Sequence, residues 1–234
     1  MTGGGARVPR CVSRHISAVA ADDRSTVAWV MIKATSGLLH WNYFIALERD
    51  LEEVSRYIEF TKRNFPTYSI ELAHLLFAAA SEVDVVAKLI CEKVAPSKRA
   101  GNIDQYRRVL MKELPEIPLI EISVPRYGLK FNPWENWGKS TTPDWWHSYN
   151  NVKHQRDAFF HEATLQNALN ALGALLAFTY IYYSYELADE PGIRLNPEET
   201  TRKLQPDSTL LRLPQGAGLF NVRIRPGGDD PPYT

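Results

Sequence analysis

The stretch YNNVKHQRDAFFHEA, residues 149–163, gathers the side chains of this chain that are best suited to chemistry. It contains two of the six histidines, His154 and His161, together with Arg156 and Asp157. An imidazole can take up and release a proton near neutral pH, and a guanidinium is a permanent cation. The stretch is therefore the first candidate for acid–base chemistry in this sequence.

The apolar pattern around this stretch predicts one long helix from residue 144 to residue 187. On a continuous helix each residue advances by about 100°. Four polar residues then fall within about 60° of one another, namely Asn150, His154, Asp157 and His161. Arg156 lies on the opposite side, about 140° from His161, so a second subunit is needed to bring both to one phosphate. The polar group continues the leucine stripe of the same helix.

A second long helix is predicted by SIELAHLLFAAASEVDVVAKLICEKV, with Ser69 as its N-cap. It is apolar on nearly every side, as is typical of a central helix in a bundle. The helices of about residues 67–94 and 144–187 each have more than one apolar face, and each needs the other to cover it. We expect them to pack antiparallel or nearly so.

The two helices also carry polar groups that could complement each other. Glu82 and Asp84 lie on the central helix, and Lys153, His154 and His161 lie on the other. A buried charge without a partner costs several kcal/mol, so carboxylates and basic groups should meet if the helices pack side by side. We predict a hydrogen bond between at least one carboxylate and one of these basic groups.

The remaining pattern predicts a mainly α fold, an antiparallel helical bundle with short β-hairpins in the middle and at the C-terminal end. An amphipathic helix begins near Leu47, and a hairpin near residues 117–131 surrounds VPRYG. Beyond residue 187, TLLRL and LFNVRI have the pattern of short strands. The chain is then divided into a poorly ordered extension (1–30), a helical domain (31–187) and a C-terminal extension (188–234).

The composition excludes several classes of function. Lys and Arg together number 27, as do Asp and Glu, so no global charge attracts nucleic acid or a membrane. Cys11 and Cys91 have no metal-ligand spacing, which is typical of a cytoplasmic protein. The apolar run ALGALLAFTYIYY is about 13 residues long, whereas a membrane span needs about 20. His147, His154 and His161 are spaced about 10.5 Å apart along a helix, too far to share an ion. We expect no metal, cofactor or membrane partner.

Two aromatic groups are candidates for contact surfaces. The first is Trp145, Trp146 and Tyr149, which either stack on bases or wedge the strand pair against the bundle. The second surrounds the end of the long helix and comprises Tyr180, Tyr182, Tyr183 and Tyr185. Some of these tyrosines should meet a second subunit, so we expect a homodimer.

Residues 39–187 resemble the HEPN group of helical-bundle proteins. The likeness is closest to an uncharacterised bacterial family in which SEVDVVAKLIC on one helix is joined to WWHSYNNVKHQR and NALNALGALL on another. Active HEPN ribonucleases carry R-x4-6-H, often with a polar residue after the arginine. Here Arg156, Asp157 and His161 supply R-D-x3-H. The resemblance implies metal-independent RNA cleavage at a site formed across a homodimer.

Two functions follow from these patterns. The first is a defence or toxin-type endoribonuclease in which His161 moves a proton and Arg156 stabilises phosphate charge. The second is a non-catalytic binding or scaffold protein whose polar network, including Glu82 and Asp84, is structural. The feature that separates the two is whether Arg156 and His161 come together in a solvent-accessible groove.

Overall fold

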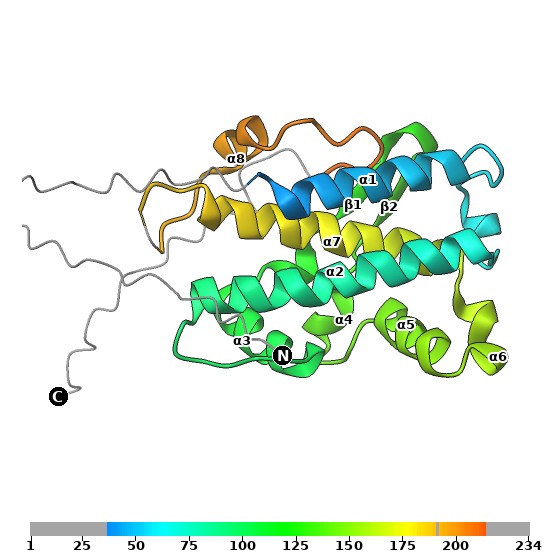
Figure 1. Cartoon of the computed structure of the whole chain (residues 1–234), viewed down its shortest axis with the longest axis horizontal. Coiled ribbons are helices and arrows are strands. Elements are labelled where there is room, and N and C mark those ends of the chain that lie inside the picture. Colours follow the sequence, from blue (N-terminus) through cyan, green and yellow to red (C-terminus); the bar gives the residue numbers. More distant parts are fainter. Residues whose placement is uncertain (1–36, 191, 214–234) are drawn as a thin grey trace, which may run out of the picture. The chain divides into compact units, whose positions relative to one another are not determined.

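A computed structural model describes residues 37–190 and 192–213 of the chain. This part is mainly helical, as predicted, with eight helices packed together and one antiparallel two-stranded hairpin (Figure 1). The helices are α1 (Leu39–Val54), α2 (Ile70–Val94), α3 (Ile103–Glu113), α4 (Glu135–Gly138), α5 (Asp144–His154), α6 (Arg156–Phe159), α7 (Leu165–Glu186) and α8 (Pro197–Lys203). The strands are β1 (Ile122–Val124) and β2 (Leu129–Phe131). Short 3-10 turns are η1 (Lys62–Asn64), η2 (Ile117–Leu119), η3 (Pro125–Tyr127) and η4 (Phe160–Glu162).

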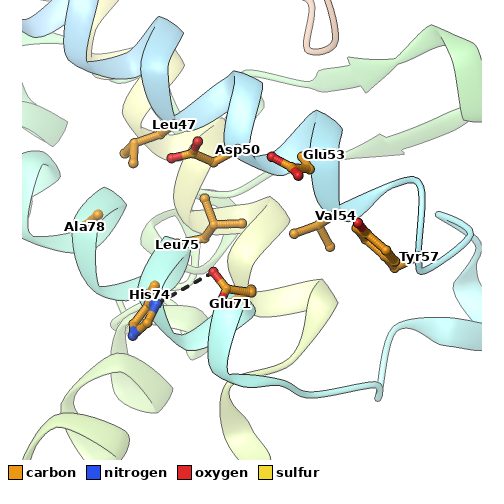
Figure 2. Close-up of a pocket in the computed structure, with 9 residues that line it drawn as sticks. All are labelled: Leu47, Asp50, Glu53, Val54, Tyr57, Glu71, His74, Leu75 and Ala78. Atoms are coloured by element: carbon orange, nitrogen blue, oxygen red, sulfur yellow. Dashed lines mark ion pairs between the residues drawn. The ribbon is translucent and has the colours of Figure 1, made fainter.

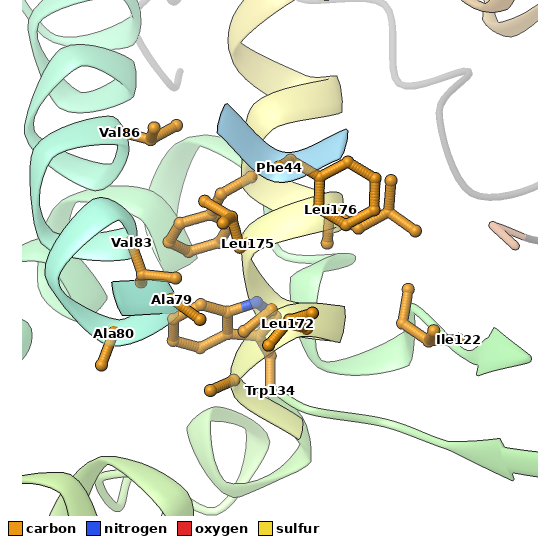
Figure 3. Packing of buried hydrophobic residues seen from close by; sticks show 14 of the residues in the cluster. Phe44, Ala79, Ala80, Val83, Val86, Ile122, Trp134, Leu172, Leu175 and Leu176 are labelled. Atoms are coloured by element: carbon orange, nitrogen blue, oxygen red, sulfur yellow. The ribbon is translucent and has the colours of Figure 1, made fainter. Parts of the chain in front are cut away.

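Helix α2 is the central helix that the sequence predicts. The side-chain oxygen of Ser69 accepts a hydrogen bond from the backbone N–H of Leu72 at 3.1 Å, which confirms the predicted N-cap. Figure 3 shows Val83 and Val86 of α2 facing the leucines of α7 across the core. Burial of this shared apolar surface is the main source of stability for both helices.

Helices α2 and α7 run parallel, so the predicted antiparallel pairing is wrong. Their first turns lie together, since the backbone N–H of Leu165 donates to the carbonyl of Thr67 at 2.8 Å. Their last turns also lie together, since Nζ of Lys93 is 2.5 Å from a carboxylate oxygen of Glu186. The same direction is visible in Figure 1.

The error arises because the predicted helix over 144–187 is two helices joined by a corner. Helix α5 ends at His154, and Gln155 has φ −141° and ψ 58°, outside the helical region. Helix α7 begins after Thr164, whose side chain accepts from the N–H of Asn167 at 3.2 Å. The chain turns back between them, so α5 runs antiparallel to α2 and α7 runs parallel to it.

The hairpin lies where the sequence places it, within residues 117–131. Ile122 pairs with Phe131 and Val124 with Leu129. Gly128 occupies the turn with φ 62°, a left-handed conformation that glycine adopts without steric cost. One face of the hairpin packs on α7 and is thereby part of the core.

The contact between the hairpin and α7 depends on Gly173. A Cβ at this position would lie 2.7 Å from Cε2 of Phe131 and 3.2 Å from Cγ1 of Ile122. We expect Gly173→Val to lower the free energy of unfolding by roughly 2 kcal/mol, because overpacking forces the hairpin away from the helix. Urea denaturation measures this. Gly101→Val is the matched control, since Gly101 has nothing closer than 4.0 Å.

The C-terminal segment returns to the first helix. Glu48 of α1 is 1% exposed, and its carboxylate accepts hydrogen bonds from the Ser208 hydroxyl and from the N–H groups of Thr209, Leu210 and Leu211. The predicted strand TLLRL is a single bridge from Arg212 to Ser123 of β1. The predicted strand LFNVRI and the predicted extension over 1–30 lie outside the described residues.

Candidate functional site

The polar stretch forms the corner between α5 and α7, which we call the 150–162 corner. Asparagine side chains from α5 and α7 both bond to Glu162 in this corner. Nδ2 of Asn151 donates to a carboxylate oxygen of Glu162 at 3.1 Å, and Nδ2 of Asn167 donates to the Glu162 carbonyl at 2.8 Å. The apolar face of the corner buries Val152 and Ala163 against α2. The corner is thus a fixed structure.

The basic and acidic side chains of this corner face solvent, so the predicted stripe on the core face is wrong. Lys153, His154, Asp157 and His161 are all exposed. The prediction assumed one straight helix, and the helical wheel no longer applies once the chain leaves the helix at Gln155.

Arg156 and His161, the predicted catalytic pair, lie on consecutive turns, α6 and η4. Both are exposed. The guanidinium carbon of Arg156 lies 5.2 Å from the ring centre of Phe77, a cation–π contact that holds the charge against α2. The ring of His161 lies 6.5 Å from that of Phe159. Within the described chain, no hydrogen bond or ring contact joins Arg156 to His161.

The last turn of α5 supplies two of the predicted supporting residues. Nζ of Lys153 donates to the hydroxyl of Tyr149 at 3.2 Å and lies 5.3 Å from the centre of the same ring. Nδ2 of Asn150 donates to the carbonyl of Trp146 at 3.0 Å. Asn150 therefore supports the helix, whereas the ammonium of Lys153 is positioned at the exposed edge of the corner.

Glu82 and Asp84 do not join this corner, so the predicted hydrogen bonds to Lys153, His154 or His161 are wrong. Glu82 is instead 2.5 Å from Nδ1 of His40. Asp84 accepts a hydrogen bond from the Tyr106 hydroxyl. The pKa of Tyr106 is raised, mainly by burial and secondly by the charge of Asp84. Both carboxylates connect α2 to neighbouring helices other than α5.

His40 is the polar residue that sequence reasoning missed. Its imidazole is largely buried between Glu82 and the edge of Tyr182, whose ring centre is 5.4 Å away. Its backbone N–H donates to the hydroxyl of Tyr183 at 3.2 Å, which satisfies part of the first turn of α1. Burial, with the nearby charge of Glu186, raises the pKa of Tyr182 to about 12. The arrangement fastens α1 to α2 and α7.

The aromatic residues of α5 belong to the core, which contradicts the base platform. Trp145, Trp146 and Tyr149 are 3%, 8% and 8% exposed. Nε1 of Trp145 donates to the carbonyl of Pro133 at 2.8 Å, and Trp134 stacks on Phe178 of α7 at 4.1 Å. Their faces are covered by protein and are closed to nucleic-acid bases.

The tyrosines at the end of α7 are also covered by their own chain. Tyr180, Tyr183 and Tyr185 are 6%, 4% and 6% exposed. The hydroxyl of Tyr180 donates to the Pro197 carbonyl at 2.6 Å, at the start of α8. Tyr182 is partly exposed, so of the four tyrosines it alone keeps a surface that a second subunit could contact, and the expected subunit contact stays a prediction.

A cavity of about 480 Å³ lies between α1 and α2, away from the 150–162 corner (Figure 2). It is lined by Leu47, Asp50, Glu53, Val54, Tyr57, Glu71, His74, Leu75 and Ala78. Figure 2 shows three carboxylates from the two helices around an apolar floor. Glu71 is 3.7 Å from Nδ1 of His74, while Asp50 and Glu53 have no partner in the described chain. None of the predicted site residues lines this cavity.

Within the described ranges, no three His, Cys, Asp or Glu side chains are grouped so that they could hold a metal ion. The same ranges contain no helix that is both long and apolar enough to span a membrane. Comparison of the chain with family models, with curated proteins and with solved structures found no match.

Proposed function

We propose that this chain is a HEPN-like protein that cleaves RNA without a metal ion, using Arg156 and His161 in a homodimer. The observation that supports this most is the exposure of both side chains on consecutive turns of a corner whose backbone is tied down. Because both side chains face solvent, an RNA phosphate can reach them without any rearrangement of the core.

The two groups suit RNA cleavage by the neighbouring hydroxyl. The 2′-oxygen bonds to phosphorus while the bond to the 5′-oxygen breaks, which leaves a 2′,3′-cyclic phosphate and a 5′-hydroxyl. His161 takes the proton of the 2′-hydroxyl or gives one to the leaving 5′-oxygen. The guanidinium of Arg156 stabilises the negative charge that grows on the phosphate oxygens.

The surroundings of Arg156 suit phosphate binding. The ring of Phe77 restricts the guanidinium, so less conformational freedom is lost when a phosphate binds. In the described part of the chain no carboxylate neutralises Arg156 or Lys153. Asp157 and Glu162 of the same corner balance Lys153 and Arg156 in formal charge, so the corner offers a phosphate two cations that have no ion-pair partner in the described chain, without a net positive charge.

The second candidate is a non-catalytic RNA-binding or scaffold protein. It is favoured by the lack of contact between Arg156 and His161 within one chain, since an isolated guanidinium and imidazole can bind phosphates without cleaving. Lys153, His154 and His161 face solvent, so they form no buried polar network with α2.

A cleavage assay in EDTA tests the proposal. Purified protein is expected to cut single-stranded RNA in EDTA and to leave 2′,3′-cyclic phosphate ends, because the chemistry uses an imidazole and a guanidinium. DNA of the same sequence should stay intact, since it has no 2′-hydroxyl. Binding of RNA without cleavage, across a varied panel of sequences, would favour the second candidate.

A further inference from the structure

One row of residues on α2 stays open to solvent, wholly or in part, after the helix has packed against the rest of the described chain. Its members follow at intervals of 3, 4, 3, 4 and 3 residues, and are Glu71, His74, Ala78, Ser81, Val85 and Lys88. The side chains of Glu71 and His74 are 72% and 65% exposed, and Val85 is 44% exposed. These are the intervals of a coiled-coil contact line, so the row faces one direction along the helix. We call it the α2 seam.

We propose that the α2 seam binds the same seam of a second copy of this chain, with the two α2 helices antiparallel about a twofold axis. The intervals along the seam read the same in both directions, so an antiparallel copy brings every member opposite another member. The inference rests on the homodimer of the proposed function and identifies its surface.

The opposing side chains in this arrangement are complementary. Glu71 lies opposite Lys88, and the twofold axis repeats this ion pair at the other end. Lys88 has no partner within the described chain, so it is free to form the pair. At the centre Ala78 lies opposite Ser81, and these small side chains allow the two backbones to approach closely.

In this arrangement the partner's α2 also covers the cavity between α1 and α2. The partner's C-terminal half of α2 arrives over it, so that Val85 of the partner subunit covers the apolar floor around Leu75. The ammonium of the partner's Lys88 arrives beside Asp50 and Glu53, which are unpaired in the described single chain. An acidic rim over an apolar floor suits the aliphatic stem and charged end of a lysine.

Other registers lose the ion pair or oppose like charges. A shift by one heptad in one sense sets Ala95 of the partner subunit opposite Glu71, in place of the partner's Lys88, and brings the partner's Glu92 opposite His74 at the acidic cavity. A shift in the other sense sets the partner's Ser81 opposite Glu71. A parallel arrangement in register sets Glu71 against the partner's Glu71, and Lys88 against the partner's Lys88. Since opposed like charges are unfavourable, the antiparallel register is selected.

The same twofold axis connects the seam to the 150–162 corner. Phe77 lies beside the seam, on the side where α5 packs, and carries the guanidinium of Arg156. A twofold axis perpendicular to the helix pair keeps both copies of this side together. Phe77 of one copy is then level with Glu82 of the other, five residues or about 7.5 Å from the partner's Phe77 along the helix. Each copy therefore brings its Arg156 toward the corner of the other.

Mass measurement in solution tests the surface. The full chain is expected to have the mass of a dimer by light scattering, and Lys88→Glu to have that of a monomer. Adding Glu71→Lys to Lys88→Glu reverses the pair and should restore the dimer. Lys112→Glu, an exposed lysine of α3, is the matched control and should stay dimeric. A monomeric wild type, or a dimeric Lys88→Glu, overturns the proposal.

Disulfide trapping tests the direction of the helices. In a Cys11→Ser background the remaining Cys91 is buried, and burial raises the pKa of its thiol to about 12, so it does not interfere. A mixture of His74→Cys with Val85→Cys should form an intermolecular disulfide. Each variant alone should not, because its own position in the partner is eleven residues, or about 16 Å, away. Cross-linking of single variants, or none in the mixture, overturns the antiparallel seam.

These outcomes are separate from those of the cleavage assay. A trapped antiparallel dimer that leaves RNA intact would support the α2 seam and contradict the ribonuclease proposal. A monomer that cuts RNA in EDTA would support the ribonuclease chemistry and contradict the α2 seam.

Discussion

In an EDTA-containing assay, His161→Ala is expected to cleave RNA roughly 10²-fold more slowly than the wild-type chain, because the variant lacks the group that moves the proton. Arg156→Lys is expected to fail similarly, since an ammonium cannot reproduce the two parallel hydrogen bonds of a guanidinium with phosphate. The rates are measured under single-turnover conditions with a labelled single-stranded RNA. His147→Ala, which changes an exposed histidine of α5, is the matched control and should keep the wild-type rate.

The position of His161 allows a loss of activity to be separated from a loss of stability. Its side chain is exposed, and among the described residues its ring contacts only that of Phe159, so its removal should change the free energy of unfolding by no more than about 0.5 kcal/mol. Thermal unfolding followed by circular dichroism checks this. A variant that loses stability and activity together would indicate a structural role for His161.

Mixing two inactive variants asks whether the site is shared. If Arg156 acts with the histidine of the partner subunit, Arg156→Ala and His161→Ala chains form mixed dimers that contain one intact site. Random pairing should then recover about a quarter of the wild-type rate. Recovery of no activity would place both groups in one chain.

Glu48→Ala is expected to lower the free energy of unfolding by roughly 3–5 kcal/mol, the scale for removing one partner of a buried charged network. The substitution leaves the N–H groups of Thr209, Leu210 and Leu211 without their acceptor. Urea denaturation, with the midpoint and slope both fitted, measures the change.

Two related variants check the cause of this loss. Glu48→Gln keeps one acceptor oxygen, which can serve Leu210 and Leu211, but its amide opposes the N–H of Thr209, so an intermediate loss is expected. Glu52→Ala, one turn along and in an exposed ion pair with Arg126, should cost no more than about 1 kcal/mol. Equal losses for Glu48→Ala and Glu52→Ala would contradict the anchoring role.

The elements with local signals were predicted from the sequence. The hairpin around VPRYG follows from alternation and a turn glycine, and α2 follows from its apolar pattern and the Ser69 cap. The corner between α5 and α7 was not predicted. The apolar residues before and after it keep the spacing of one continuous helix, so the pattern does not show that the chain reverses direction. The cap at Thr164 was the available signal, since its side chain bonds the N–H three residues later.

The environment of single polar residues was harder to predict than the elements. Glu48 lies among the acids of an amphipathic helix and has the pattern of an exposed residue, yet its partners lie more than 150 positions later in the chain. Glu82 was matched to the wrong helix for the same reason, because His40 lies outside the stretches with a clear polar motif. Charge pairing over long separations depends on packing that local spacing does not encode.

The anchoring of residues 208–211 on Glu48 also constrains the order in which the molecule can be completed. Helix α1 is synthesised early. The donors that bind the Glu48 carboxylate are absent until the segment beyond α8 has left the ribosome. During that interval the nascent first helix keeps a hydrated charge on the side that will later be buried. Because the chain is synthesised from its N-terminus, α1 can dock against residues 208–211 only late in folding. Burial of Glu48 therefore depends on the last described segment of the chain.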